Sequence, residues 1–195
     1  TPLFYLAQYG YQHGSEILAA LLGKGAKLEA RNNRGETPLF ACAQSGPFAM
    51  LTELEKNGAS KSAKTSDGRT LLHAAMLRPN LEKVNWLLDN GANPKAVDQA
   101  DRTPLHLVAA AIPQQGTYEV IAALITRGAA VNARDENGRT PLMLAVQARA
   151  VTTVACLLNH GAKAGIGDKD GKTALDFISS DAPPEMVQLL RNAVK

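Results

Sequence analysis

The side chains that could carry catalysis or bind a metal are few and scattered. The chain has two cysteines and four histidines. A nucleophile needs a base beside it, and a metal site needs ligands at short, regular spacing. Cys42 and Cys156 fall among apolar residues, which predicts buried thiols. No histidine has an obvious second ligand, and no elbow motif surrounds Ser15, Ser45, Ser60, Ser62 or Ser66.

The nearest approach to a metal-binding motif is Asp168-Lys169-Asp170-Gly171. It is similar to the start of a calcium loop, but the third ligand and the distal glutamate are missing. The same segment also stands where the chain elsewhere places tight turns. We therefore expect a chain that is not an enzyme and that has no metal site and no cofactor.

Two of the histidines, His73 and His106, belong to a recurring tetrapeptide, written most fully as Thr103-Pro104-Leu105-His106. Versions of it begin at residues 1, 37, 70, 103, 140 and 173, at intervals of 36, 33, 33, 37 and 33 residues. Gly-Ala pairs follow at residues 25, 58, 91, 128 and 161. A histidine that recurs in this way is most simply a structural residue.

The tetrapeptide has the chemistry of a helix start. Threonine caps the first turn, and proline suits the first helical position because its missing N–H has no helical partner there. A second apolar stretch at helical spacing follows, such as Val84, Leu87 and Leu88. The glycine of each Gly-Ala pair can close that helix in the left-handed conformation. Each unit therefore predicts two antiparallel helices and an extended connection.

The connections contain turn signals just before the threonine. These are Arg34-Gly35, Asp67-Gly68, Asn137-Gly138 and Asp170-Gly171. Such pairs supply the positive φ of a tight hairpin. The fourth connection has Ala100-Asp101 instead, and we expect its turn to form with some strain because aspartate tolerates positive φ better than most residues.

A period near 33 residues with this tetrapeptide resembles the ankyrin-repeat family. The resemblance implies an all-α fold, a solenoid of stacked antiparallel helix pairs with β-hairpin or loop connections. We expect one domain over residues 1–195, with the first and last repeats as caps. The expected repeats span residues 1–30, 31–63, 64–96, 97–133, 134–165 and 166–195.

Composition narrows the class of partner. The net charge is +3, and no run of basic residues is present, which argues against nucleic-acid binding. No apolar stretch approaches the length of a membrane span. We expect a monomer when the chain is alone. Its compartment stays open between the cytoplasm, as the default, and the bacterial periplasm if a signal peptide was removed.

The resemblance implies binding of another protein through a concave face formed by hairpin tips and first helices. The matching positions here include Arg31, Asn33, Arg34, Glu36, Gln44, Arg69, Leu77, Arg78, Gln99, Arg102 and Arg139. To these we add Ala111, Ile112 and Pro113, which lie in the long connection of the fourth repeat.

Two features of this set suggest a kind of partner. Arg34, Arg69, Arg102 and Arg139 recur beside successive hairpins. They are either a solvated basic edge or a ladder for carboxylates of an acidic partner, since arginine suits bidentate pairing. The Ala111-Ile112-Pro113 stretch adds apolar side chains within an insertion, as in a protein-binding patch.

Two functions remain open. The first is an inhibitor or self-protection protein that covers a partner enzyme with an acidic patch, as some bacterial ankyrin proteins of similar size do. The second is an adaptor or host-directed effector fragment whose activity lies outside this chain. Loss of a partner enzyme's activity on mixing would favour the first, and a gene that encodes much more chain would favour the second.

Overall fold

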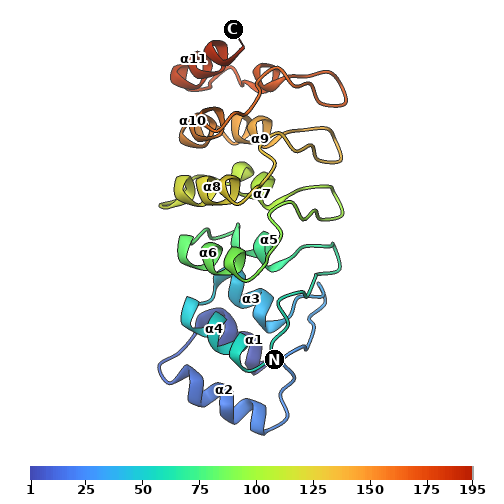
Figure 1. Cartoon of the computed structure of the whole chain (residues 1–195), viewed down its shortest axis with the longest axis vertical. Helices are drawn as coiled ribbons and strands as arrows, with labels where there is room; N and C mark the ends of the chain where they lie inside the picture. Colours follow the sequence, from blue (N-terminus) through green and yellow to red (C-terminus); the bar gives the residue numbers. More distant parts are fainter. Residues whose placement is uncertain (195) are drawn as a thin grey trace. The chain divides into compact units, whose positions relative to one another are not determined.

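The computed structural model describes residues 1–194, and within them the fold is entirely helical, as predicted, with no β-strand. Figure 1 shows the helices in chain order. They are α1 (Pro2–Tyr9), α2 (Gly14–Gly23), α3 (Pro38–Ser45), α4 (Phe48–Lys56), α5 (Leu71–Ala75), α6 (Leu81–Asp89), α7 (Pro104–Ala110), α8 (Thr117–Thr126), α9 (Pro141–Gln147), α10 (Val151–Asn159), the 3-10 helix η1 (Ala174–Phe177) and α11 (Pro184–Ala193).

The contacts divide the chain into two compact units. Unit 1 comprises residues 1–78 and 82–92, and unit 2 comprises residues 79–81 and 93–195. In unit 1, α1 packs against α2 and α3, and α3 packs against α4 and α5. In unit 2, α7 packs against α8 and α9, α10 packs against α8, α9 and α11, and η1 packs against α9 and α11. A single domain over residues 1–195 stays a prediction.

The recurring tetrapeptide starts helices as predicted. Thr37, Thr103 and Thr140 are extended N-cap residues, each followed by a proline in the first helical turn. The Gly-Ala glycines are left-handed, with φ between 83° and 96° at residues 25, 58, 91, 128 and 161. At these ends the alanine N–H donates to a carbonyl five residues back, as from Ala162 to Leu157, which satisfies a free helix-end carbonyl.

Each unit has a core of leucine, valine and alanine between its helix pairs. Leu39 and Leu72 are fully buried in unit 1, and Leu105, Leu142 and Leu157 are fully buried in unit 2. Small residues such as Ala43 and Ala109 have no exposed surface either, which allows the first helices of neighbouring repeats to approach closely.

The last repeat departs from the expected helix pair. Its first helix is only η1, a single 3-10 turn that ends at Phe177. The chain continues with Ser179 and Ser180, whose hydroxyls compete for backbone groups, and then with Pro183 and Pro184, which disfavour a helix just before them. Such a sequence cannot extend the helix beyond one turn.

The connections form hairpin turns without a strand ladder. In the turn that begins at Asp98, the N–H of Asp98 donates to the carbonyl of Arg102, and the N–H of Asp101 donates back to Asp98. The predicted hairpins therefore exist as closed turns, too short to count as β-structure. Among residues 1–194, no helix is long and apolar enough to span a membrane.

Candidate functional site

Both cysteines are buried and free, as the sequence predicted. Burial raises the pKa of the Cys42 thiol to about 12, although the nearby Lys83 ammonium acts in the opposite direction. Burial also raises the pKa of Cys156 to about 11, and the charge of Glu119 adds to the effect. Since the thiolate is the reactive form, neither cysteine is suited to nucleophilic chemistry at neutral pH.

One pair of potential ligands was not predicted from the sequence. Cys156 and His160 stand four residues apart at the end of α10, and their Sγ and Nδ1 atoms are 3.8 Å apart. The i,i+4 spacing on a helix was the signal that could have revealed this pair. The pair does not amount to a metal site, since no cluster of three His, Cys, Asp or Glu side chains exists in residues 1–194.

His106 holds neighbouring repeats together within unit 2. Its Nδ1 lies 3.1 Å from the Thr103 N–H and accepts that bond, while its Nε2 lies 3.1 Å from the Arg139 carbonyl oxygen. A carbonyl can only accept, so Nε2 carries the proton. Burial lowers the pKa of His106, against the opposing bond to Arg139. The structural role inferred for this histidine therefore has a clear geometry.

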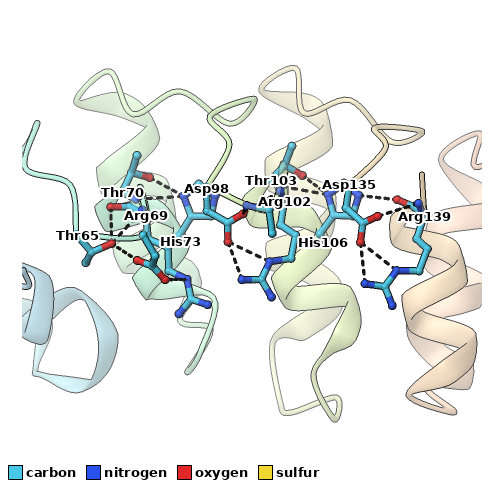
Figure 2. A network of polar contacts seen from close by, with 12 residues as sticks. Thr65, Arg69, Thr70, His73, Asp98, Arg102, Thr103, His106, Asp135 and Arg139 are labelled. Carbon is cyan, nitrogen blue, oxygen red and sulfur yellow. Dashed lines mark hydrogen bonds and ion pairs between the residues drawn. The ribbon is translucent and has the colours of Figure 1, made fainter. Parts of the chain in front are cut away.

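Aspartates organise the turns of unit 2. Oδ1 of Asp98 accepts the N–H groups of Ala100 and Arg102, and Oδ2 lies 2.8 Å from the Arg102 guanidinium. Asp135 binds Arg139 in the same way, with 3.0 Å between the charged groups (Figure 2). Both aspartate side chains are only 1% exposed. Each pair fixes a turn and keeps its guanidinium beside the buried carboxylate.

The electrostatics of Asp98 follow from these bonds. Burial alone would raise the pKa of this carboxyl. The hydrogen bonds from the side chain and backbone of Arg102, and from the backbone of Ala100, outweigh burial and leave the pKa below its ordinary value. Asp98 is therefore an ionised structural group.

The predicted arginine row consists of side chains that already have carboxylate neighbours. Arg102 and Arg139 form ion pairs with the buried aspartates of their own turns. Arg69 pairs with Asp67 at 3.1 Å, whereas Arg34 is 80% exposed and lies 3.8 Å from Glu36. Of these four, Arg34 is the one most available to a partner.

Arg31, another predicted contact, also has an internal role. Its Nη1 donates to the carbonyls of Gly35 at 2.8 Å and Lys64 at 2.7 Å. It thereby closes its own turn and ties it to the next connection of unit 1. Asn33, at the tip of the same turn, is exposed.

The predicted contacts of unit 1 gather around two adjoining cavities. A cavity of about 280 Å³ is lined by five of them, Arg34, Glu36, Gln44, Arg69 and Leu77, together with Phe40, Thr65, Ser66, Asp67 and Ala74. A second, of about 380 Å³, is lined by Gln8, Tyr9, Gln44, Ser45, Leu77 and Arg78. Because both include Gln44 and Leu77, we refer to them together as the unit-1 groove.

Several groove residues were absent from the predicted set. Phe40 and Ala74 are buried almost completely, and their remaining surface forms part of the lining. Gln8 and Tyr9 come from the first repeat, from which no contact was predicted. Gln8 corresponds to Gln44, because each lies seven residues after the threonine of its recurring tetrapeptide. The alignment of the repeats could therefore have revealed it.

In unit 2, the predicted apolar contacts occupy the connection between α7 and α8. Ile112 is 82% exposed there, and Ala111 and Pro113 are half-buried. Gln99 lies exposed in the turn that Asp98 and Arg102 close. The isoleucine side chain is therefore largely open to solvent, and its role as a contact residue stays a prediction.

The comparisons with known proteins agree with this architecture. Residues 105–195 match a model of ankyrin repeats in three copies, and residues 71–112 match a model of ankyrin repeats in many copies. A stretch of 74 residues is 39% identical to the ankyrin repeat protein FPV219 of fowlpox virus (strain NVSL). That match covers 37% of this chain and 17% of the viral protein, so the chain spans about a sixth of the curated relative.

The described residues contain the same features several times, namely threonine-capped helix starts, paired helices, left-handed glycines and closed turns. The two family models together span residues 71–195. Ankyrin repeats are modules for protein–protein interaction. The chain belongs to the ankyrin-repeat family.

Proposed function

We propose that the chain is a non-catalytic module that binds a partner protein through its hairpin turns and first helices. The observation that carries this proposal is the unit-1 groove, where five predicted contacts line one cavity. Exposed Leu77 and Ile112 add aliphatic side chains, which contribute most to binding when a partner covers them.

In its most specific form, the partner is an enzyme and the chain inhibits it or protects the producing cell from it. Support comes from Ile112, which projects from a connection longer than that of the regular repeats and so could enter a concave site. An acidic rim on that enzyme would complement Arg34 and Arg78. Only this form of the proposal assumes that the protein comes from a bacterium.

The alternative is an adaptor or a host-directed effector fragment. One observation favours it, namely that the chain spans about a sixth of an ankyrin repeat protein from a virus. In this case the chain supplies binding and another part of a longer protein supplies the activity.

Affinity capture from a lysate of the producing cells, and separately of host cells, tests the proposal. The bait is the intact chain, compared with a variant carrying Arg34→Ala, Arg78→Ala and Ile112→Ala. We expect the variant to bind the partner at least about tenfold more weakly, because each truncated contact in a binding surface can cost more than about 1 kcal/mol of binding free energy.

The matched control carries Lys56→Ala, Arg191→Ala and Val194→Ala, which removes two exposed cations and one aliphatic side chain elsewhere. It should retain the partner fully. A partner held equally by all three baits would contradict the proposed surface. If the captured protein is an enzyme, its turnover with the added chain separates inhibition from tethering.

A further inference from the structure

The unit-1 groove has a chemistry that indicates the kind of segment it holds. Its two cavities share Gln44 and Leu77, so they form one elongated depression. Its lining residues come from α1, α3, α5, the turns before α3 and α5, and the connection that follows α5, which supplies Leu77 and Arg78. An elongated groove of this kind suits a stretch of extended chain better than a compact ligand.

The floor of the groove offers one apolar contact. Leu77 is 44% exposed although it follows the fully buried Met76. Beside it, Phe40 and Ala74 line the same cavity and are 3% and 1% exposed. An aliphatic or aromatic side chain laid over Leu77 would remove this apolar surface from water, which is favourable in proportion to the area covered.

Polar side chains along the groove are available for a peptide backbone. In the described residues, the side chains of Gln8, Gln44 and Ser45 make no hydrogen bond. A glutamine amide both donates and accepts, which matches the alternating N–H and C=O groups of an extended strand. Gln44, common to both cavities, can satisfy one backbone unit at the middle of the segment.

The charges of the groove favour an anion. Arg69 is paired with Asp67 at 3.1 Å, and Arg34 has Glu36 at 3.8 Å. Arg78 is exposed and has no ion pair in the described residues. Arg78 lines one end of the groove, where its charge repels a basic segment and attracts a carboxylate.

We propose that the unit-1 groove binds an extended acidic segment of the partner protein, with one large apolar side chain over Leu77 and a carboxylate paired with Arg78. This inference rests on the proposed function and deepens it. The backbone of the segment bonds to Gln44, and a second carboxylate can approach Arg34.

The probe is a library of nonapeptides randomised at the central positions, sorted for binding to the full chain. We expect selected peptides to be rich in Asp and Glu and to carry one Leu, Ile, Met or Phe. Among matched synthetic peptides, changing Glu to Gln should weaken binding by about tenfold, as expected for a lost charge-assisted contact.

Variants of the chain assign the two contacts. Arg78→Gln should weaken binding of the acidic peptide by about tenfold and leave binding of its glutamine version unchanged. A double-mutant cycle measures this coupling. Leu77→Ser should weaken peptides with the apolar residue and spare those with serine in its place. Arg191→Gln, an exposed arginine of α11, is the charge-matched control and should change nothing.

Selection of basic peptides, absence of any binder, or equal binding to wild type and Arg78→Gln would each overturn the inference. The proposed function fails separately, when no captured protein depends on Arg34, Arg78 and Ile112. A partner that still depends on Ile112 while the peptide probes fail would therefore refute the acidic segment alone.

Discussion

At the scale of single residues, one turn has an aspartate where the other turns have a glycine. Asp101 has a φ of 56°, in the place where other turns use left-handed Gly35, Gly68, Gly138 and Gly171. At Gly138, an added Cβ would lie 2.9 Å from the backbone nitrogen of Lys169, and at Gly35 it would lie 2.8 Å from that of Ser66. Those positions need glycine for space as well as conformation.

Replacing Asp101 by glycine removes the strain of a left-handed side-chain-bearing residue. We expect Asp101→Gly to stabilise the chain by about 0.5–1 kcal/mol, since the steric relief exceeds the added flexibility of the unfolded chain. Urea unfolding followed by circular dichroism measures the change. Asp101→Ala is the control and should destabilise, because alanine adopts the left-handed region less readily than aspartate; a less stable glycine variant would contradict this explanation.

At the scale of elements, one side chain joins α7 to the turn of the following repeat. His106 of α7 bonds both to its own N-cap, Thr103, and to the Arg139 carbonyl in the turn before α9. Protonation of Nδ1 would turn an acceptor into a donor that faces the Thr103 N–H. The bond from the Thr103 N–H therefore requires a neutral imidazole, whereas the bond from Nε2 to the Arg139 carbonyl does not.

This requirement makes stability dependent on pH. Because burial lowers the folded pKa of His106, the unfolded chain takes up a proton first as the pH falls below about 6.5. The stabilisation is complete above that pH and is lost as the pH falls towards the folded pKa, by up to about 1.4 kcal/mol per pH unit.

Urea unfolding at about pH 7.5 and about pH 5 should show this loss in the wild type and a smaller loss in His106→Gln. Leu105→Ala is the control, since it destabilises the same helix and keeps the histidine. An equal pH dependence in the wild type and His106→Gln would rule out the histidine as its source.

Much of the element pattern follows directly from sequence. Threonine and proline start α3, α7 and α9, and a Gly-Ala glycine ends five of the second helices. The shortness of η1 was less evident, because the tetrapeptide before it is intact and the limit comes from the serines and prolines after it.

The candidate surface was only partly predictable. The i,i+4 spacing of Asp98 with Arg102 and of Asp135 with Arg139 was visible, but a turn that brings them together had to be known before the pairing could be inferred. The groove combines residues of three repeats, so its lining depends on packing and not on any local pattern.

At the scale of the whole molecule, the repeats predict one cooperative domain while the contacts form two compact units. Neighbouring repeats of a solenoid stabilise one another, so damage in one region can spread along the array. The chain has one tryptophan, Trp86 of α6, which packs edge-on against Phe48 within unit 1 and reports on that unit.

A core substitution in unit 2 tests whether the domain is single. Leu157 of α10 is fully buried, and Leu157→Ala should cost about 2–5 kcal/mol. If residues 1–195 unfold as one domain, Trp86 fluorescence and circular dichroism should shift to the same new urea midpoint. A fluorescence midpoint that stays at the wild-type value while the circular dichroism transition splits would instead indicate two independently folding units.

The way neighbouring turns are joined has a consequence for how such a chain changes over evolutionary time. The N–H of Ser66 donates to the carbonyl of Arg34, and those of Glu136 and Lys169 donate to Ala100 and Asn137. These bonds use backbone atoms only, and the first side chain of each turn does the local bonding. The side chains at the tips are therefore free to be exchanged with little effect on the scaffold. A lineage can acquire a new partner by substitution there while inheriting the same fold.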